Sequence, residues 1–572
     1  MQKIVLATFN SKYIHSSLGL YSLKAYAEQK GFAVDVMEFS LQTPVLNALY
    51  DITSKSPAIA GLAVHIWNKK EVFLLAKMLK QVMPELILVL GGPEVSYAVE
   101  DTFSQVSADF IVQGEGESAF AQLISALNSG QTGTGIKGIA RKETDGSINK
   151  EGGAQIIEDI SALAFPYDFA ADTFKNRIVY YESTRGCPFD CAYCLSGIDK
   201  TVRFKPLGKI CEELSLFIDN GVKQVKFVDR TYNLDKNHYF PIMKWLAEQN
   251  TKTNFHFEIK ADNLDKETLS FLASVPKGLF QFEIGVQSTN EKTLLASGRK
   301  QDWNKLADSV HYIKEKNNIH LHLDLIAGLP YEGLAEFKKS FNDVYSLKPD
   351  MLQIGFLKLL KGSKLQEDAY FHDYIFMPEP PYEVLGNKYI SNRELFKLKI
   401  LEEVFEQTYN SDKFQYMLEY MTRHAASPYD FYEGLSAWCY DKGFLAVGQG
   451  PGSVANYLSD FVKERYPEMF AEVLDCLKMD ILLYHDSNFR PEYIKWQDTA
   501  KGSLAEKFWR DETRAGRYIK GYKFTSWRDI NAKYHIDIFE NYFLNEKITK
   551  NKAVLFEKKA VKWQAIDDKD FF

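Results

Sequence analysis

The strongest constraint on the fold is an alternation of short apolar runs with helical patterns, which occurs twice along the chain. The first series has apolar runs near residues 3–8, 33–38, 59–64, 86–90 and 110–112, with helical patterns near 20–29 and 70–83. Such alternation predicts an α/β domain with a doubly wound parallel sheet, which binds ligands at the carboxyl ends of its strands. We expect this Rossmann-like domain at residues 1–150, ending in a hairpin around Asp145-Gly146, and a linker at 151–174.

The second series places strands near residues 179–183, 224–228, 255–259, 280–286, 320–326 and 351–356, with helical patterns between them. Six strand–helix units suit a partial, TIM-like (β/α)6 barrel better than a second open sheet, and barrel chemistry lies at the carboxyl ends of the strands. We expect this barrel at residues 175–372. The remaining residues, 373–572, are predicted to be mostly helical, for example at 393–409, 413–424 and 467–484, with one strand candidate at 553–556.

Composition narrows the class of protein. The 572 residues are 45% hydrophobic and 25% charged, with a net charge of -7, which indicates a globular chain with no overall basic field for nucleic acid. No apolar run approaches the roughly 20 residues of a spanning helix, and the start of the sequence lacks the pattern of a secretory signal. We therefore expect a cytoplasmic protein with no membrane span and no nucleic-acid partner.

Three of the six cysteines, Cys187, Cys191 and Cys194, form a CxxxCxxC motif directly after the first predicted barrel strand. Thiolates are the usual ligands of iron–sulfur clusters, and three from one loop can hold three irons of a [4Fe-4S] cluster while the fourth iron stays open. A structural zinc is the alternative, but it needs four ligands, and Cys211 is predicted to lie on a helix. We predict that the three cysteines are both the metal ligands and the catalytic centre.

The run TRGCPFDCAYC, from Thr184 to Cys194, resembles the signature of radical S-adenosylmethionine (SAM) enzymes. The first domain resembles the cobalamin-binding domain that often precedes them, and the tail is similar to the uncharacterised C-terminal extension of one subgroup. The resemblance implies three cofactors: a [4Fe-4S] cluster, SAM and cobalamin. It implies that the reduced cluster cleaves SAM to a 5′-deoxyadenosyl radical, which abstracts hydrogen from an unactivated C–H bond. It also implies a small-molecule or unknown substrate and an electron donor such as flavodoxin or ferredoxin.

The barrel strand ends carry the SAM contacts that this resemblance implies. Tyr193, before the third cysteine, resembles the family residue near the adenine. The segment after the second strand departs from the family's Gly-Gly-Glu type, although Asp229 and Thr231 offer the same kind of acceptor. Gln287 and Ser288 are candidates for the ribose or the methionine carboxylate, and Arg299 is either a cation for that carboxylate or part of a surface salt bridge. The other predicted SAM contacts are Glu258, Glu283 and Gly328, while Lys358 and Lys361 either face substrate or are solvated.

The loops of the first domain carry the implied cobalamin contacts. Well-known cobalamin domains use Asp-x-His-x-x-Gly to supply an imidazole ligand, but here Tyr13 replaces the aspartate and the glycine is displaced to Gly19. We therefore expect His15 to be a hydrogen-bonded loop residue without a role as cobalt ligand, and residues 64–68 to approach the lower face of the ring. The predicted cobalamin contacts are Asn10, Tyr13, His65, Trp67, Gly91, Gly92, Pro93, Glu94, Gly114 and Glu115.

Three functions stay open at this point. The leading one is methylation of an unactivated carbon, in which one SAM methylates cobalamin and another generates the radical. The second keeps both cofactors but performs an oxidation, cyclisation or rearrangement, and the third is a non-catalytic cobalamin or redox sensor. Methylthiotransferases are excluded, because they carry three more cysteines in the first domain whereas none precedes Cys187 here.

Overall fold

The computed structural model describes residues 2–143, 145–150, 153–170, 172–174, 176–446, 448–485, 489–496, 504–542, 549–558 and 562–571. The chain divides into two compact units, one of residues 1–349 with 354–392 and one of residues 350–353 with 393–572. The border between them follows Asn392, which is later in the chain than the predicted border at residue 372. Each unit is described by itself.

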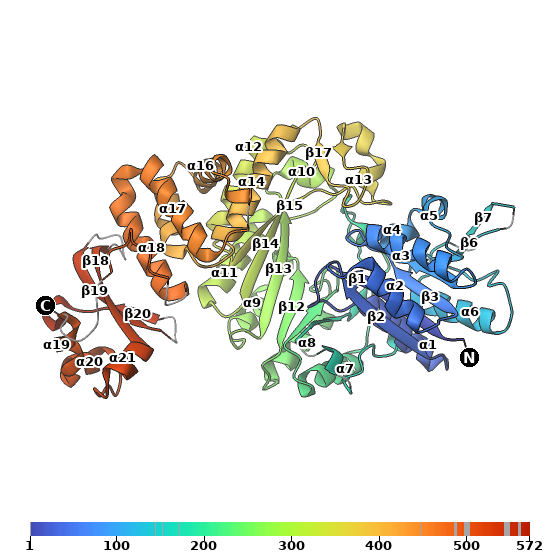
Figure 1. Ribbon diagram of the computed structural model, residues 1–572, viewed down its shortest axis with the longest axis horizontal. Coiled ribbons are helices and arrows are strands. Elements are labelled where there is room, and N and C mark those ends of the chain that lie inside the picture. The colour runs from blue at the N-terminus through green and yellow to red at the C-terminus, as the bar shows by residue number, and fades with distance from the viewer. Residues whose placement is uncertain are drawn as a thin grey trace. The chain divides into compact units, whose positions relative to one another are not determined.

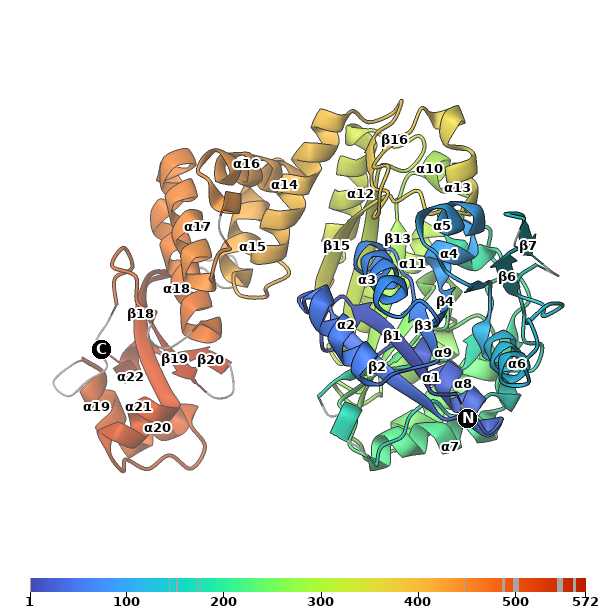
Figure 2. The same cartoon turned by 45° about the vertical axis from the view of Figure 1, so that its right-hand side comes forward.

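The N-terminal sheet has the predicted doubly wound architecture (Figures 1 and 2). Five strands pair in parallel in the order β2-β1-β3-β4-β5: β1 (Ile4–Asn10), β2 (Val34–Ser40), β3 (Ile59–Ala63), β4 (Ile87–Gly91) and β5 (Phe110–Val112). The predicted hairpin forms β6 (Ile139–Lys142) and β7 (Ile148–Lys150), which extend the same sheet in antiparallel fashion. Two apolar cores cover its faces. One involves α2 (Val45–Ser54), α3 (Lys69–Val82) and α5 (Val99–Gln105), and the other α1 (Leu18–Gln29) and α6 (Gly116–Asn128).

This strand order fixes where a ligand can bind. The chain runs from β1 outward to β2 and then back across β1 to β3, so the connections leave β1 and β3 toward opposite faces of the sheet. Sheets of this order bind ligands at that switch point, outside the carboxyl ends of the two strands. The loops at residues 11–17 and 64–68, which follow β1 and β3, therefore flank the expected site.

The second sheet has the six predicted strands in sequential order: β8 (Ile178–Tyr181), β11 (Gln224–Phe227), β12 (Asn254–Ile259), β13 (Phe280–Gln287), β14 (His320–Ala327) and β15 (Met351–Phe356). Neighbours from β8 to β14 pair in parallel, as in a partial barrel. The intervening helices are α7 (Leu207–Asp219), α8 (Lys236–Glu248), α9 (Lys266–Leu272), α10 (Glu291–Ala296), α11 (Trp303–Lys316) and α12 (Leu334–Ser346). Strand β13 alternates buried apolar residues with polar or small ones, so one face packs in the core and the other offers polar groups.

The second unit is mostly helical, as predicted, but it also contains a sheet. Its helices are α14 (Asn392–Thr408), α15 (Gln415–His424), α16 (Pro428–Asp441), α17 (Pro451–Arg465), α18 (Phe470–Tyr484), α19 (Leu504–Arg510), α20 (Glu512–Tyr518), α21 (Trp527–Lys533) and α22 (Asp568–Phe571). The predicted strand at 553–556 lies within β19 (Thr549–Glu557), which pairs with β18 (Tyr534–Tyr542) and β20 (Lys562–Ala565) in an antiparallel sheet.

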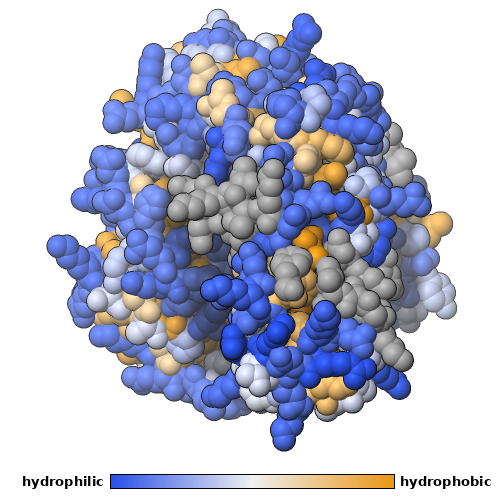
Figure 3. Space-filling view, turned by 90° about the vertical axis from the view of Figure 1, so that its left-hand side faces the viewer, coloured by the Kyte–Doolittle hydropathy of each residue, from blue (hydrophilic) through white to orange (hydrophobic). Residues whose placement is uncertain are grey.

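The face of the molecule drawn in Figure 3 is largely hydrophilic where its residues are described, with smaller hydrophobic patches between the charged side chains. Across the described residues, no helix combines the length and apolarity needed to cross a membrane.

Candidate active site

The three cysteines lie on a loop whose stem is a two-stranded ladder of β9 (Thr184–Arg185) and β10 (Arg203–Phe204). Gly186 opens the loop with φ +99°, and a Cβ there would lie 2.3 Å from the carbonyl oxygen of Thr201, so only glycine fits. The Cys187 amide donates to the carbonyl of Asp199 (2.9 Å), and the Cys194 Sγ accepts from the Ser196 amide (3.4 Å). All three cysteines are free thiols, as thiolate ligands must be before a cluster binds.

A polar cavity of about 210 Å³ adjoins this loop. Phe189 and Cys191 line it from the cysteine loop. The rest of the lining comes from residues at the carboxyl ends of β11 to β14 and after α10: Arg230, Thr231, Glu258, Ile259, Lys260, Glu283, Gly285, Gln287, Gly298, Arg299, Lys300 and Asp324. The cavity thus lies where barrel enzymes bind their reactants, beside a cysteine sulfur.

Five of the residues predicted to contact SAM line this cavity, namely Thr231, Glu258, Glu283, Gln287 and Arg299. The structure does not place Arg299 in a surface salt bridge. Its guanidinium donates to the Gly285 carbonyl and lies 4.0 Å from the Cys191 Sγ. Gln287 adopts φ +68°, and its buried Oε1 has no hydrogen-bond partner among the residues the structure describes. A free acceptor and a buried cation beside a thiol fit a polar ligand held next to a cluster.

The carboxylates of the cavity differ in their affinity for protons. Glu283 accepts from Lys226 (2.9 Å) and lies 3.1 Å from the His256 Nε2. Although burial opposes ionisation, the hydrogen bond with His256 and the charge of Lys226 lower the pKa of Glu283 to about 2. Burial instead raises the pKa of Glu258. Glu283 therefore carries a fixed negative charge in the cavity and suits a ligand ammonium group.

Sequence reasoning assigned no role to four polar residues on strands β11, β12 and β14, whose carboxyl ends line the cavity. These residues are Lys226, His256, His322 and Asp324. The His322 Nε2 lies 3.0 Å from the Asp324 Oδ1, and burial raises the pKa of Asp324. Their signal was present, because histidine and acidic residues alternate with apolar ones along β12 and β14.

Three other residues predicted to contact SAM lie outside the lining of this cavity, and their roles stay predictions. Asp229 is fully buried away from the cavity and accepts from the Ser183 amide (3.0 Å) and from the Ser183 and Thr184 hydroxyls (2.5 and 2.6 Å). Burial raises its pKa to about 6, and its carboxyl group supports the strand before the cysteine loop. Ser288 is also buried and donates to Glu332 (2.5 Å). The Gly328 carbonyl accepts from Tyr374 and Asn387, and none of these three predicted contacts lines the cavity.

Tyr193 is also absent from the lining of the cavity, but its phenol interacts with Arg299 and Cys191, which do line it. Burial raises the pKa of its phenol, the charge of the neighbouring Arg299 opposes this shift, and Cys191 and Cys194 add to it. The adenine contact of Tyr193 therefore stays a prediction.

Exposed aromatic side chains mark the ligand-binding edge of the first domain. Tyr13 is 77% exposed and Trp67 is 46% exposed, although side chains of this size are usually buried. Trp67 stacks on His65 with ring centroids 4.4 Å apart, and its Nε1 donates to the Phe9 carbonyl (3.1 Å). Burial lowers the pKa of His65 to about 4, so this imidazole is neutral. An exposed flat surface at the switch point fits a large ring such as a corrin.

Glycines shape the neighbouring loops. Gly92 has φ +105°, and a Cβ there would lie 2.5 Å from the Val64 carbonyl oxygen. Gly114 has φ +77°, with Gln155 similarly close. Gly91 ends β4 and Pro93 begins the short helix α4 (Pro93–Ser96), so both set the backbone of this turn.

Three of the residues predicted to contact cobalamin are bound to other protein groups. The Asn10 amide donates to the His15 carbonyl (3.0 Å) and to Glu38 (2.9 Å). Glu94 accepts from the Tyr382 hydroxyl (2.8 Å), and Glu115 lies 2.8 Å from Arg203. The partners of Glu94 and Glu115 are far away in sequence, so no local pattern signals these two contacts.

His15 is hydrogen-bonded as expected, with its Nδ1 2.6 Å from the Tyr180 hydroxyl. Lys361 pairs with Asp101 (2.6 Å) and is therefore not simply solvated. Among the residues described, no group of three histidine, cysteine or acidic side chains is arranged to hold a single metal ion.

Models of three protein families match the chain. The B12 binding domain matches residues 4–124, the radical SAM superfamily matches 181–344, and a domain described only as a protein of unknown function (DUF4080) matches 371–556. Each match agrees with one of the three predicted regions.

Two curated relatives resemble the chain over 55% of its length. The chain is 26% identical over 324 residues to an uncharacterised methyltransferase, PH0819, from Pyrococcus horikoshii, covering 55% of this chain and 69% of that one. It is 25% identical over 343 residues to the cobalamin-dependent radical SAM methyltransferase TokK from Streptomyces tokunonensis, covering 55% of this chain and 49% of TokK. The chain thus spans about half the length of this second relative.

A solved structure shares the fold. It is the cobalamin-dependent SAM radical enzyme OxsB with aqua-cobalamin and SAM bound, which matches with a TM-score of 0.64 and 14% identity. The match covers 86% of this chain and 82% of OxsB.

Proposed function

We propose that this chain, a radical SAM protein that carries a B12-binding domain, binds SAM in the cavity beside the cysteine loop and methylates an unactivated carbon. The observation that carries the proposal is the position of Cys191 in the wall of a polar cavity at the carboxyl ends of the barrel strands. Methyl transfer is supported by the names of both curated relatives, which are methyltransferases.

The cofactors are a [4Fe-4S] cluster, SAM and cobalamin. When bound, the cluster supplies the electron that cleaves SAM, and cobalamin carries the methyl group. Cys187, Cys191 and Cys194 hold three irons. The ionised carboxylate of Glu283 binds the ammonium of SAM, and the free Oε1 of Gln287 accepts a hydrogen bond from a ligand hydroxyl or amine.

We propose that the first domain holds the corrin ring against Tyr13 and Trp67, because these aromatic groups are exposed at the switch point of the sheet. We also propose that the substrate is a small molecule. The electron donor of the flavodoxin or ferredoxin type and the cytoplasmic location stay predictions.

The test is anaerobic reconstitution with iron, sulfide and hydroxocobalamin, followed by assay of SAM products with a reductant. Methyl transfer predicts both S-adenosylhomocysteine and 5′-deoxyadenosine. 5′-Deoxyadenosine without S-adenosylhomocysteine would instead support the non-methylating radical reaction.

The role of Glu283 has its own test. In Glu283→Gln we expect the KM for SAM to rise roughly tenfold or more, because a hydrogen bond to a charged group is lost. The matched control is Glu267→Gln on α9, whose side chain is 63% exposed. Equal KM values for Glu283→Gln and wild type would contradict this assignment.

A further inference from the structure

Two arginines stand opposite each other at the stem of the cysteine loop. Arg185 on β9 is the register partner of Arg203 on β10, in the two-stranded ladder at which the cysteine loop begins and ends. Their side chains are only 15% and 7% exposed. Like charges directly opposite on neighbouring strands destabilise the ladder, and burial increases the repulsion. The stem therefore needs negative charge close to both guanidinium groups.

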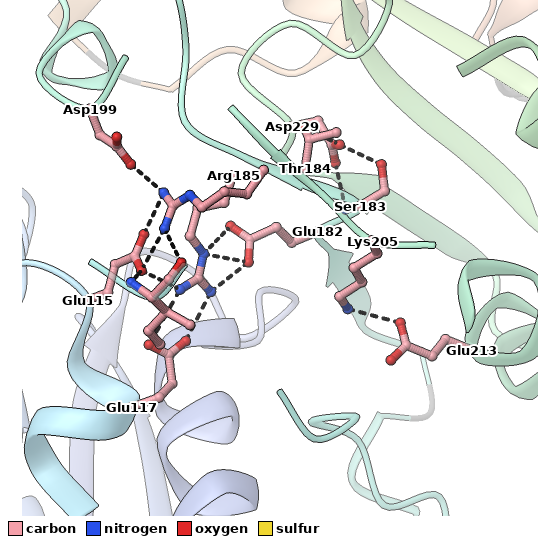
Figure 4. A network of polar contacts seen from close by, with 12 residues as sticks. Glu115, Glu117, Glu182, Ser183, Thr184, Arg185, Asp199, Lys205, Glu213 and Asp229 are labelled. Carbon is pink, nitrogen blue, oxygen red and sulfur yellow. Dashed lines mark hydrogen bonds and ion pairs between the residues drawn. The ribbon is translucent and has the colours of Figure 1, made fainter. Parts of the chain in front are cut away.

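The B12-binding domain supplies part of this charge (Figure 4). Glu115 lies directly before α6, and Glu117 lies in the first turn of this helix. The Glu115 carboxylate contacts both arginines, at 2.8 Å from the Arg203 Nη2 and 3.4 Å from the Arg185 Nη1. Glu117 lies 2.9 Å from the Arg185 Nη2. Glu115 therefore contacts both arginines, whereas Glu117 contacts Arg185.

The barrel itself supplies the remaining charge. Glu182 pairs with Arg185 (2.6 Å), and Asp199 pairs with Arg203. The Asp199 carbonyl also accepts the Cys187 amide hydrogen (2.9 Å). Asp199 thus connects Arg203 to the backbone of the first cysteine.

We propose that Glu115 is a positioning residue for the iron–sulfur site: by neutralising the arginine pair, this carboxylate of the B12-binding domain sets the backbone of the cysteine loop. The domain then has a second role besides holding its own cofactor. The inference rests on the proposed function only in taking Cys187, Cys191 and Cys194 as the cluster ligands.

The test compares Glu115→Gln with the matched control Glu182→Gln in the full-length protein without cofactors. Hydrogen–deuterium exchange of residues 186–202 is measured by mass spectrometry. We expect exchange to rise at least tenfold in Glu115→Gln, and less than threefold in Glu182→Gln, because Arg185 keeps Glu115 and Glu117. Exchange in β12 and β13 stays as in wild type. Wild-type exchange of the loop in Glu115→Gln, or equal increases in the two variants, would overturn the proposal.

A double variant decides the outcome if Glu115→Gln loosens the whole chain. Glu115→Gln with Arg203→Gln removes one of the two facing positive charges, so loop exchange is expected to return to within threefold of wild type. Failure of this rescue would overturn the proposal.

A spectroscopic readout follows in the reconstituted protein. We expect the reduced cluster of Glu115→Gln to give an altered electron paramagnetic resonance spectrum at unchanged cobalamin content, and an unaltered spectrum would count against the proposal. Because the exchange experiment uses the protein without cofactors, it holds even if no methyl transfer is found, so the two proposals fail separately.

Discussion

Glu332, in the turn after β14, is a buried acid whose protonation can be tested. It is 1% exposed, and its Oε1 accepts from the Ser288 hydroxyl (2.5 Å) and the Ser340 hydroxyl (3.2 Å). Burial raises its pKa from 4.5 to about 8, so the folded protein holds this acid protonated near neutral pH.

The sign of the pH effect follows from this shift. Because the folded pKa is above the unfolded value, the stabilisation is fully present below about pH 4.5 and is lost as the pH rises through about 8. One pH unit in this window is worth about 1.4 kcal/mol, so wild type loses roughly 2 to 3 kcal/mol between pH 6 and pH 8 through this group.

The perturbation is Glu332→Gln, which keeps the acceptor for both serines and does not ionise. The assay is hydrogen–deuterium exchange of peptides from β13 and β14, expressed as the wild-type rate divided by the variant rate at each pH. We expect this ratio to rise roughly 30- to 150-fold from pH 6 to pH 8. The control Glu315→Gln changes an exposed acid of α11 and leaves the ratio independent of pH. The same ratio at both pH values for Glu332→Gln would refute the reasoning.

Three further changes have defined outcomes. Glu38→Gln removes the charge that faces buried Arg177 at 2.7 Å, so we expect a loss of about 3 to 5 kcal/mol by denaturant unfolding, and a loss below about 1 kcal/mol would contradict the pairing. Trp67→Ala should lower cobalamin retention after desalting roughly tenfold, because an exposed stacking surface is lost, and full retention would place the ring elsewhere. Gly92→Ala should cost more than about 1 kcal/mol in thermal unfolding because of its positive φ, whereas Gly208→Ala, with open space around it, should not.

The alternating strands and helices could be predicted because their signals are local. The parallel strands of the first sheet are short, mostly apolar runs, and the cysteine spacing lies within one loop. The sheet of the second unit was only partly predicted, although β18 carries its own alternating signal in Ile536, Asp537 and Ile538. The prediction for this region followed the helical pattern of its aromatic-rich segments, so only one strand was expected.

The partners of the buried acids could not be predicted from local sequence. Asp229 resembles a ligand acceptor at a strand end, but Ser183 and Thr184, which precede it by more than 40 residues, occupy its oxygens. Glu94 and Glu115 lie on a ligand-binding edge, yet their partners Tyr382 and Arg203 come from other parts of the chain. Tertiary contacts of this kind decide which carboxylates remain available to a cofactor.

The most direct measurement is 5′-deoxyadenosine formation by the anaerobically reconstituted, reduced protein, compared with a variant in which Cys187, Cys191 and Cys194 are all alanine. If the loop holds a SAM-cleaving cluster, wild type forms 5′-deoxyadenosine and the triple variant, with the iron signal of the cluster gone, forms none. Equal 5′-deoxyadenosine formation by both proteins, or none by wild type with a full cluster and bound SAM, would contradict the assignment of this chain as a radical SAM enzyme.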